Sequence, residues 1–354
     1  MTEQNPRGET DRPLKHRKRK IICLLLLFIS AAFLIRVFSD ISEGRRLMKE
    51  MQAGAERVFA YPDLDRGFIP QGIDLDESLD AYFLSGYSSV FGPSPVYVLN
   101  RRDGKLIAHA VLNKENGKDF SGHSGGIAVW HDYVYVAATN NGVYIFSRQD
   151  VLHAKNGERI RALGHIPVRV SDRQVKASFL SVHDDVLTIG EFRIPVILDT
   201  PESHHFLTAS GEKRNALAVS FSLTENQPFG VNPDPVSVYA IPDYSQGILF
   251  VNQRIVISAA VLEANSHIYV FDETQLKECA RIETDGETVP VYGLDTSVLT
   301  GVRAFPPMNE EAEYTEGRLV IVNESACGRY RIGRFYGMEY CYSFPAEALI
   351  PETG

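Results

Sequence analysis

The sequence of 354 residues predicts an all-β fold, a five-bladed β-propeller, behind an N-terminal transmembrane helix. One short phrase recurs at blade-like spacing, each time followed by a polar turn and an apolar run suited to a strand. Repeats of roughly 40–60 residues built from short strands are typical of β-propellers. Three copies contain the pairs Gly72-Ile73, Gly126-Ile127 and Gly247-Ile248, and looser copies occupy 177–182 and 309–314.

Each repeat is expected to supply four antiparallel strands, of which the first lies innermost. In the fourth repeat we expect residues 278–283 to form the outermost strand. In the fifth, residues 329–335 and 338–344 are expected to form the last two strands and complete the ring without help from the N-terminal segment. A six-bladed fold is the alternative, and its extra unit would have to lie in the long insertion of the third repeat, residues 192–214.

The N-terminus predicts a single membrane span. A basic cytoplasmic tail, residues 1–20, is followed by an apolar signal anchor, residues 21–38, and then by a helical stalk, residues 39–60, and the propeller domain, residues 61–354. The excess of Lys and Arg before the apolar run places the N-terminus in the cytoplasm and the propeller outside the cell membrane. A cleaved signal peptide is the alternative, but the residues that end the run are bulky rather than small.

Charge and cysteine content limit the partners. Residues 51–354 contain 39 acidic and 25 basic residues, so the body repels phosphate and a nucleic-acid partner is not expected. The sequence contains no Cys-x-x-Cys, and Cys279, Cys327 and Cys341 allow at most one internal disulfide of undetermined pairing. We expect no cofactor, with Ca²⁺ as the one possible exception.

Three phrases carry a resemblance to a group of known proteins. Residues 122–129 (GHSGGIAV), 306–311 (PPMNEE) and 323–327 (NESAC) resemble those of bacterial membrane-anchored or secreted β-propeller proteins. The similarity covers about residues 65–345. It implies the fold and the cellular address, and it implies no activity or catalytic residue.

Propeller topology brings distant residues to one face. The start of each innermost strand and the end of the next strand emerge on the same side, where propellers commonly bind ligands over the central channel. His204 and His205 in the insertion are expected to be solvated loop residues. The candidate ligand-binding residues on this face are Gln71, His123, Glu191, Gln246, Asn309, Glu310 and Glu324.

These residues favour a binding or scaffolding module for a glycan, peptide or protein partner. A carboxylate-dependent glycoside hydrolase or lyase is the alternative, with Glu191 and either Glu310 or Glu324 as its carboxyl pair. A third possibility is Ca²⁺ bound by hard oxygen ligands from Glu191, Asn309, Glu310 and Glu324. The sequence contains no Gly-x-Ser-x-Gly, P-loop, His-Glu-x-x-His or EF-hand motif.

The anchor predicts the outcome of a protease experiment. Protease added to intact cells should remove the propeller and leave a small N-terminal fragment, because residues 21–38 remain in the mature protein. Immunoblotting with tags at both ends would measure this. A mature protein that begins beyond Phe38 would contradict the anchor.

Overall fold

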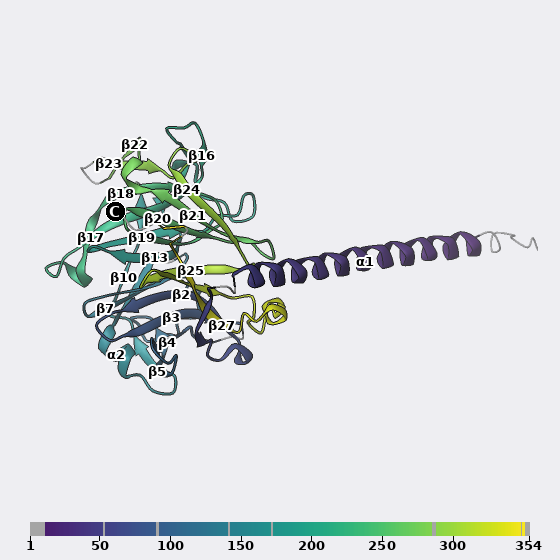
Figure 1. The fold of residues 1–354 in the computed structure, drawn as a ribbon, viewed down its shortest axis with the longest axis horizontal. Helices are drawn as coiled ribbons and strands as arrows, with labels where there is room; N and C mark the ends of the chain where they lie inside the picture. The colour runs from purple at the N-terminus through teal and green to yellow at the C-terminus, as the bar shows by residue number, and fades with distance from the viewer. Residues whose placement is uncertain are drawn as a thin grey trace, which may run out of the picture. The chain divides into compact units, whose positions relative to one another are not determined.

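The computed structural model describes residues 11–51, 54–89, 92–140, 142–170, 173–284, 288–347 and 349–350. The chain divides into two compact units, one up to Glu43 and one from Gly44 onward. Figure 1 shows the second unit as strands grouped into several small sheets.

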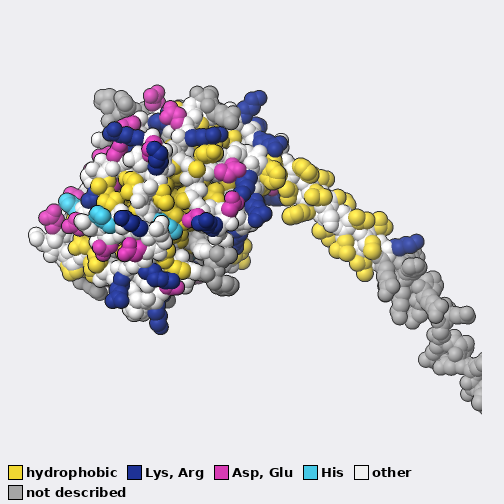
Figure 2. Space-filling view, turned by 90° about the horizontal axis from the view of Figure 1, so that it is seen from below, with side chains coloured by type: hydrophobic (Ala, Val, Ile, Leu, Met, Phe, Trp, Pro, Cys, Tyr) yellow, Lys and Arg dark blue, Asp and Glu magenta, His cyan; other side chains and the backbone are white. Residues whose placement is uncertain are grey.

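Helix α1 (Asp11–Met51) contains the predicted membrane span. Apolar side chains cover its described part, and none of its apolar stretch is buried (Figure 2). An exposed apolar helix near the N-terminus fits a membrane anchor or a signal sequence. The predicted stalk is helical only as far as Met51.

Five innermost strands form a closed ring in which each contacts the next and the last contacts the first. The ring confirms the five-bladed prediction and excludes the six-bladed alternative. Each ring strand is the edge strand of its own sheet, so its inner edge faces the centre of the molecule, where the ring protects it. In order, the ring strands are β2 (Phe68–Asp76), β6 (Ile127–Trp130), β13 (Ala177–His183), β19 (Ser245–Val251) and β25 (Asn309–Thr315).

Blades 1 and 2 follow the sequence prediction closely. Both alternate apolar runs with polar turns, as half-buried antiparallel strands require. Blade 1 continues with β3 (Ala81–Ser88), β4 (Pro95–Asn100) and β5 (Leu106–Asn113), and adds β9 (Glu158–Arg161) in parallel to β5. Blade 2 continues with β7 (Tyr133–Ala137), β8 (Val143–Ser147) and β10 (Gly164–Ile166).

Blade 3 is the widest sheet, with six strands. Its insertion contributes short elements and no sixth blade. The sheet continues with β14 (Val186–Glu191), β17 (Ala216–Leu223), β18 (Val231–Ile241), β23 (Thr288–Gly293) and β22 (Glu278–Glu283). The remaining short elements of the body are η1 (Leu64–Arg66), α2 (Arg148–His153), β11 (Arg169–Val170), β12 (Arg173–Gln174), η2 (Glu202–His204), β15 (Phe206–Leu207), β16 (Lys213–Arg214), η3 (Pro228–Gly230), η4 (Glu273–Gln275) and η5 (Ile332–Tyr336).

Blade 4 differs from the prediction in its outermost strand. It contains β20 (Arg254–Ala259), β21 (Ser266–Asp272) and β24 (Leu299–Phe305). Residues 278–283 instead form β22, which pairs with β23 and so joins blade 3. An outer strand has few neighbours to specify it, so its apolar pattern alone does not select the blade to which it belongs.

Blade 5 is completed by the first strand of the propeller, contrary to the prediction. Its third strand is β27 (Tyr340–Pro345), which pairs with β26 (Arg318–Asn323). Its outermost strand is β1 (Glu56–Ala60), from the segment predicted to be stalk, and β1 pairs with β27 antiparallel. Residues 329–335 form no strand, and most of them belong to η5 (Ile332–Tyr336). The two ends of the propeller sequence are thus hydrogen-bonded to each other.

The closing strand is held by its apolar side chains. Phe59 is 3% exposed and lies in a core shared by blades 5, 1 and 4. Its ring centroid lies 5.7 Å from that of Tyr61 and 5.8 Å from that of Tyr82. These contacts tie β1 to blade 1 as well as to its own sheet.

Phe59→Ala should therefore destabilise the propeller by about 3–5 kcal/mol, the usual cost of removing a buried aromatic ring. Denaturant titration of the full chain in detergent would measure it. Phe335→Ala is the matched control, since Phe335 is 56% exposed, and it should change the free energy of unfolding by less than about 0.5 kcal/mol. Equal effects would show that β1 does not hold the ring closed.

Candidate functional site

Irregularities in the innermost strands shape the centre of the propeller. The pairing register shifts between Pro70 and Ile73 in β2 and between Asn309 and Ala312 in β25, and β13 and β19 shift at equivalent places. A bulge leaves backbone groups outside the ladder and bends the strand. Four of the five phrases that recur in the sequence coincide with these bulges.

Glu311, in the bulge of β25, accepts hydrogen bonds from backbone donors on the inner edges of neighbouring blades. Its Oε2 accepts hydrogen bonds from the backbone N–H of Ile73 at 3.1 Å and of Ile127 at 3.3 Å. Its Oε1 accepts one from the N–H of Leu180 at 2.8 Å. One side chain of blade 5 therefore bonds to blades 1, 2 and 3. Burial raises the pKa of Glu311 well above its usual range, although these three hydrogen bonds act in the opposite direction.

The recurring glycines make room for this carboxyl group. A Cβ on Gly126 would lie 2.1 Å from Glu311 Oε1, and a Cβ on Gly72 would lie 2.8 Å from Oε2. A Cβ on Gly247 would lie 2.9 Å from the Cα of Glu311. The repeated glycine therefore reflects close approach at the axis and not a requirement for a special backbone angle.

A cavity of about 350 Å³, here named the mouth cavity, lies on the side of Glu311 where Gln71 and Glu310 point. This volume is at the lower end of the range for small-ligand pockets. All five blades or their loops contribute to it. Its lining is Gln71, Tyr87, Gly122, His123, Ala138, Thr139, Asn140, Ser178, Phe192, Ile194, Leu198, Gln246, Leu262, Met308, Glu310, Glu324 and Tyr330.

Two carboxyl groups lie in this cavity. Glu310 is 3% exposed and Glu324 is 9% exposed. Gln71 Nε2 donates to Glu324 Oε2 at 2.9 Å, and Gln246 Nε2 donates to Glu310 Oε1 at 3.4 Å. Burial raises the pKa of Glu324 to about 8, and burial together with the charge of Glu324 raises the pKa of Glu310 well above its usual range. The pair thus retains protons at pH values where exposed glutamates have lost them.

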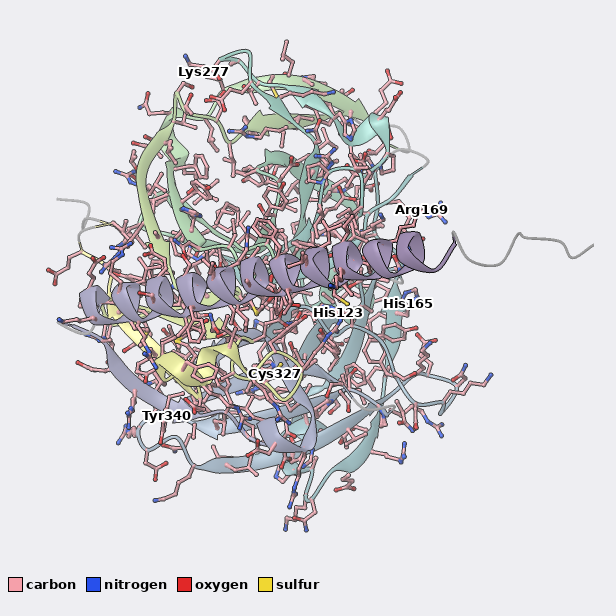
Figure 3. The ribbon with its side chains drawn as sticks, turned by 90° about the vertical axis from the view of Figure 1, so that its right-hand side faces the viewer. His123, His165, Arg169, Lys277, Cys327 and Tyr340 are labelled. Carbon is pink, nitrogen blue, oxygen red and sulfur yellow. The ribbon has the colours of Figure 1, made fainter. Side chains whose placement is uncertain are left out.

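Aromatic side chains form one wall of the cavity. The rings of Tyr87 and His123 lie 4.4 Å apart, centroid to centroid. Burial, together with the charge of Arg329, lowers the pKa of His123 to about 4, so the imidazole is neutral at neutral pH. Figure 3 labels His123 and Cys327, from blades 2 and 5, near the middle of the body. Arg329 is exposed beside Tyr330, with its guanidinium carbon 5.3 Å from the ring centroid.

An apolar tip lies next to the cavity, in the segment that follows β14. Ile194 and Leu198 line the cavity, while Val196 and Ile197 between them are 93% and 74% exposed. Arg193 fixes the base of the segment through ion pairs with Asp199 at 2.7 Å and Asp243 at 2.8 Å. Val196 has a φ of 70°, which costs energy for a β-branched residue. Residues 194–198 are named the apolar tip below.

Five of the predicted ligand-binding residues line the mouth cavity: Gln71, His123, Gln246, Glu310 and Glu324. Asn309 lies next to Glu310, but its side chain does not line the cavity. Its Oδ1 accepts a hydrogen bond from Asn323 Nδ2 at 2.9 Å, and its backbone N–H donates to Ser266 Oγ at 2.9 Å. Asn309 therefore connects β25 to blades 4 and 5.

Glu191 also lies outside the cavity, although the adjacent Phe192 lines it. Both carboxylate oxygens of Glu191 lie within 3.1 Å of His204 Nδ1, and they accept hydrogen bonds from the N–H groups of Lys176 and Leu217. His204 is fully buried, so the expectation that it is a solvated loop residue is wrong. Glu191 and His204 hold the insertion to blade 3, and Glu191 does not line the mouth cavity with Glu310 and Glu324.

Sequence analysis missed several residues of the centre. Tyr87, Tyr330 and the apolar tip line or border the mouth cavity, and Glu311 ties the blades together. Glu311 adjoins Glu310 in a strand. Because side chains alternate along a strand, the two carboxyl groups point in different directions, and only one of them can line the cavity. The exposed run of residues 194–198, apolar within a polar insertion, was a signal that could have been recognised.

Two other cavities lie apart from these residues. One of about 300 Å³ lies on the other side of Glu311 and contains Asp74, Glu313 and His183. Burial raises the pKa of Asp74 to about 6. A larger one of about 650 Å³ lies at the outer strands of blades 2 and 3 and contains His165 and Arg169. Among the described residues, no group of three or more His, Cys, Asp and Glu side chains is arranged to hold a metal ion.

Comparisons with known proteins concern the fold alone. No family model and no curated protein match the sequence. Glutaminyl cyclase of Myxococcus xanthus is similar over 82% of this chain and 94% of its own, with 11% identity and a TM-score of 0.40. The WD40 repeats of RRP9 are similar over 83% of this chain and 97% of their own, with 7% identity and a TM-score of 0.38. Hydrazine synthase of Kuenenia stuttgartiensis is similar over 72% of this chain and 55% of its own, with 10% identity and a TM-score of 0.36. The chain therefore spans about half of that protein.

The glycine at the axis gives a stability prediction. Gly126→Ala should destabilise the propeller by about 1–3 kcal/mol, because the added methyl displaces Glu311 from its hydrogen bonds. Gly301→Ala is the control, since its nearest neighbour would be a Leu349 methyl at 3.5 Å. Denaturant titration of both variants would compare them. A neutral Gly126→Ala would show that Glu311 does not depend on this space.

The carboxyl pair gives a pH prediction. A glutamate whose pKa is higher in the folded protein stabilises it most at low pH, and that contribution is lost as the pH rises through the folded value. Between pH 5 and 8, the free energy of unfolding should fall less in Glu324→Gln than in the wild type, by about 1–3 kcal/mol. Chemical denaturation across this range would test it. Glu263→Gln, at an exposed position, should follow the wild type.

Proposed function

We propose that the protein is a membrane-anchored, extracytoplasmic binding module that captures a peptide or protein partner at the mouth cavity. Residues 21–38 hold it in the cell membrane, with the N-terminus in the cytoplasm. The observation that carries the proposal is the conjunction of a mouth cavity, lined by buried polar side chains from several blades, with an apolar tip held rigidly beside it. Rigid apolar groups exposed beside a concave polar site are typical of protein interaction surfaces.

The apolar tip favours a peptide or protein over a glycan as the occupant. Val196 and Ile197 offer exposed aliphatic side chains, which suit apolar contacts with a peptide or protein. Arg193 pre-organises the tip through its two ion pairs. A pre-organised surface loses less entropy on binding, which favours affinity.

The proposal requires no cation. Glu191 and Asn309 are occupied by internal hydrogen bonds, so Ca²⁺ would have only Glu310 and Glu324 as carboxylate ligands from the expected set. Binding should therefore be the same in Ca²⁺ and in chelator.

A display experiment tests the proposal. The full chain in lipid nanodiscs would be used to select from a random peptide library, with a glycan array in parallel. Selected peptides should bind Ile197→Asp at least about tenfold more weakly than the wild type, because a charge replaces apolar contact area. Ile107→Asp, on the exposed outer strand of blade 1, should bind as the wild type does. Enrichment of glycans only, or peptide binding indifferent to Ile197→Asp, would contradict the proposal.

A further inference from the structure

The mouth cavity is lined by more acidic than basic side chains. Glu310 and Glu324 both line it, where the neutral amide of Gln246 donates to Glu310 and that of Gln71 donates to Glu324. Among the described residues that line the cavity, none is Lys or Arg. Arg329 is exposed beside Tyr330, and its charge lowers the pKa of Glu324 without cancelling the rise caused by burial. Two buried carboxyl groups thus lack a cationic partner within the cavity.

We propose that the mouth cavity accepts a basic side chain of the partner, lysine or arginine, between Glu310 and Glu324. This inference rests on the proposed function, since it names the side chain that the captured partner inserts. The cation forms charge-assisted hydrogen bonds with the carboxylates, and the apolar tip contacts the residues that flank it in the partner.

The walls suit such a side chain. Tyr87, His123 and Tyr330 line the cavity and present aromatic rings to it, and a cation over an aromatic face is attracted by the ring electrons. Met308, Leu262 and Ile194 supply apolar surface against which the methylene groups of lysine or arginine can pack. A carboxylate or phosphate would instead meet two acidic groups.

Charge balance determines how the ligand is held. In the empty cavity a proton offsets the repulsion between the two carboxyl groups, and burial stabilises that protonated state. An entering ammonium or guanidinium takes over this neutralisation, and the proton leaves to solvent. Binding is therefore coupled to proton release and strengthens as the pH rises toward the pKa of the pair, about 8 for Glu324.

The tyrosine, cysteine, histidine and arginine side chains near the pair do not titrate in this range. Burial raises the pKa of Tyr87 and of Cys327, and it raises that of Tyr330 to about 12. His123 is already neutral, as its pKa is lowered to about 4. Arg329 stays charged, and Glu324 partly offsets its repulsion of an entering cation. Glu311 keeps its backbone hydrogen bonds on the other side of the bulge.

The wider electrostatic field also favours a basic ligand. Residues 51–354 contain 39 acidic and 25 basic residues. A net negative body raises the encounter rate of cationic partners and lowers that of anionic ones, and the effect weakens with salt. Local and long-range charge therefore select the same class of side chain.

Three capped peptides that differ at one position test the inference: acetyl-Leu-Lys-Leu-amide and its Gln and Glu counterparts. Calorimetry with the full chain in nanodiscs should show the Lys peptide binding at least about tenfold more tightly than the Gln peptide at pH 7.5. Its affinity should rise up to about tenfold per pH unit between pH 6 and 7.5. Buffers of different ionisation enthalpy should report proton release.

Variants separate the carboxyl pair from the rest of the cavity. Glu310→Gln and Glu324→Gln should bind the Lys and Gln peptides about equally, while Glu263→Gln should keep the preference for Lys. If a variant fails to fold, proton release by the wild type still decides the matter, since no release overturns the inference.

The possible failures are distinct. Equal binding of the Lys and Gln peptides by the wild type, sensitive to Ile197→Asp, would overturn the basic-side-chain inference and leave the proposed function standing. Peptide binding that no mouth variant alters would overturn both.

Discussion

The carboxyl group of Glu311 is the constraint on which the centre of this propeller depends. Its hydrogen bonds to Ile73, Ile127 and Leu180 join three blades to a fourth, where otherwise buried N–H groups would lack acceptors. The bulges, the glycines and the position of the mouth cavity follow from this arrangement. A residue larger than glycine at 126 cannot coexist with it, and Glu310 reaches the cavity because Glu311 occupies the axis.

The functional site follows from the same geometry. Consecutive residues of one bulge point in different directions. Glu311 therefore bonds to the neighbouring blades, while Glu310 lines the mouth cavity. Glu324 comes from the end of the neighbouring strand, and Gln71 and Gln246 come from other blades. Residues separated by up to 253 positions in sequence therefore meet without any loop having to be flexible.

The sequence predicted the blades better than their edges. Innermost strands such as β2 and β19 are specified by apolar residues and by the glycine that clears the axis, so the number of blades could be inferred. Outer strands have fewer neighbours. Residues 278–283 and 56–60 were assigned wrongly because a local preference for strand or helix does not identify the strand with which a segment pairs. In the site, propeller topology brought five candidates together, whereas the engagement of Glu191 with His204 depends on an insertion whose path the sequence does not indicate.

The pairing of β1 with β27 has a consequence for biosynthesis. During translation β1 is synthesised before the other propeller strands and β27 after them. β1 therefore has no partner strand until nearly the whole propeller has been synthesised. Contacts so distant along the chain are slow to form, and an unpaired strand is prone to associate with other chains. Folding of the propeller therefore completes only after β27 has been synthesised, and the unpaired strand of the nascent chain needs protection until then.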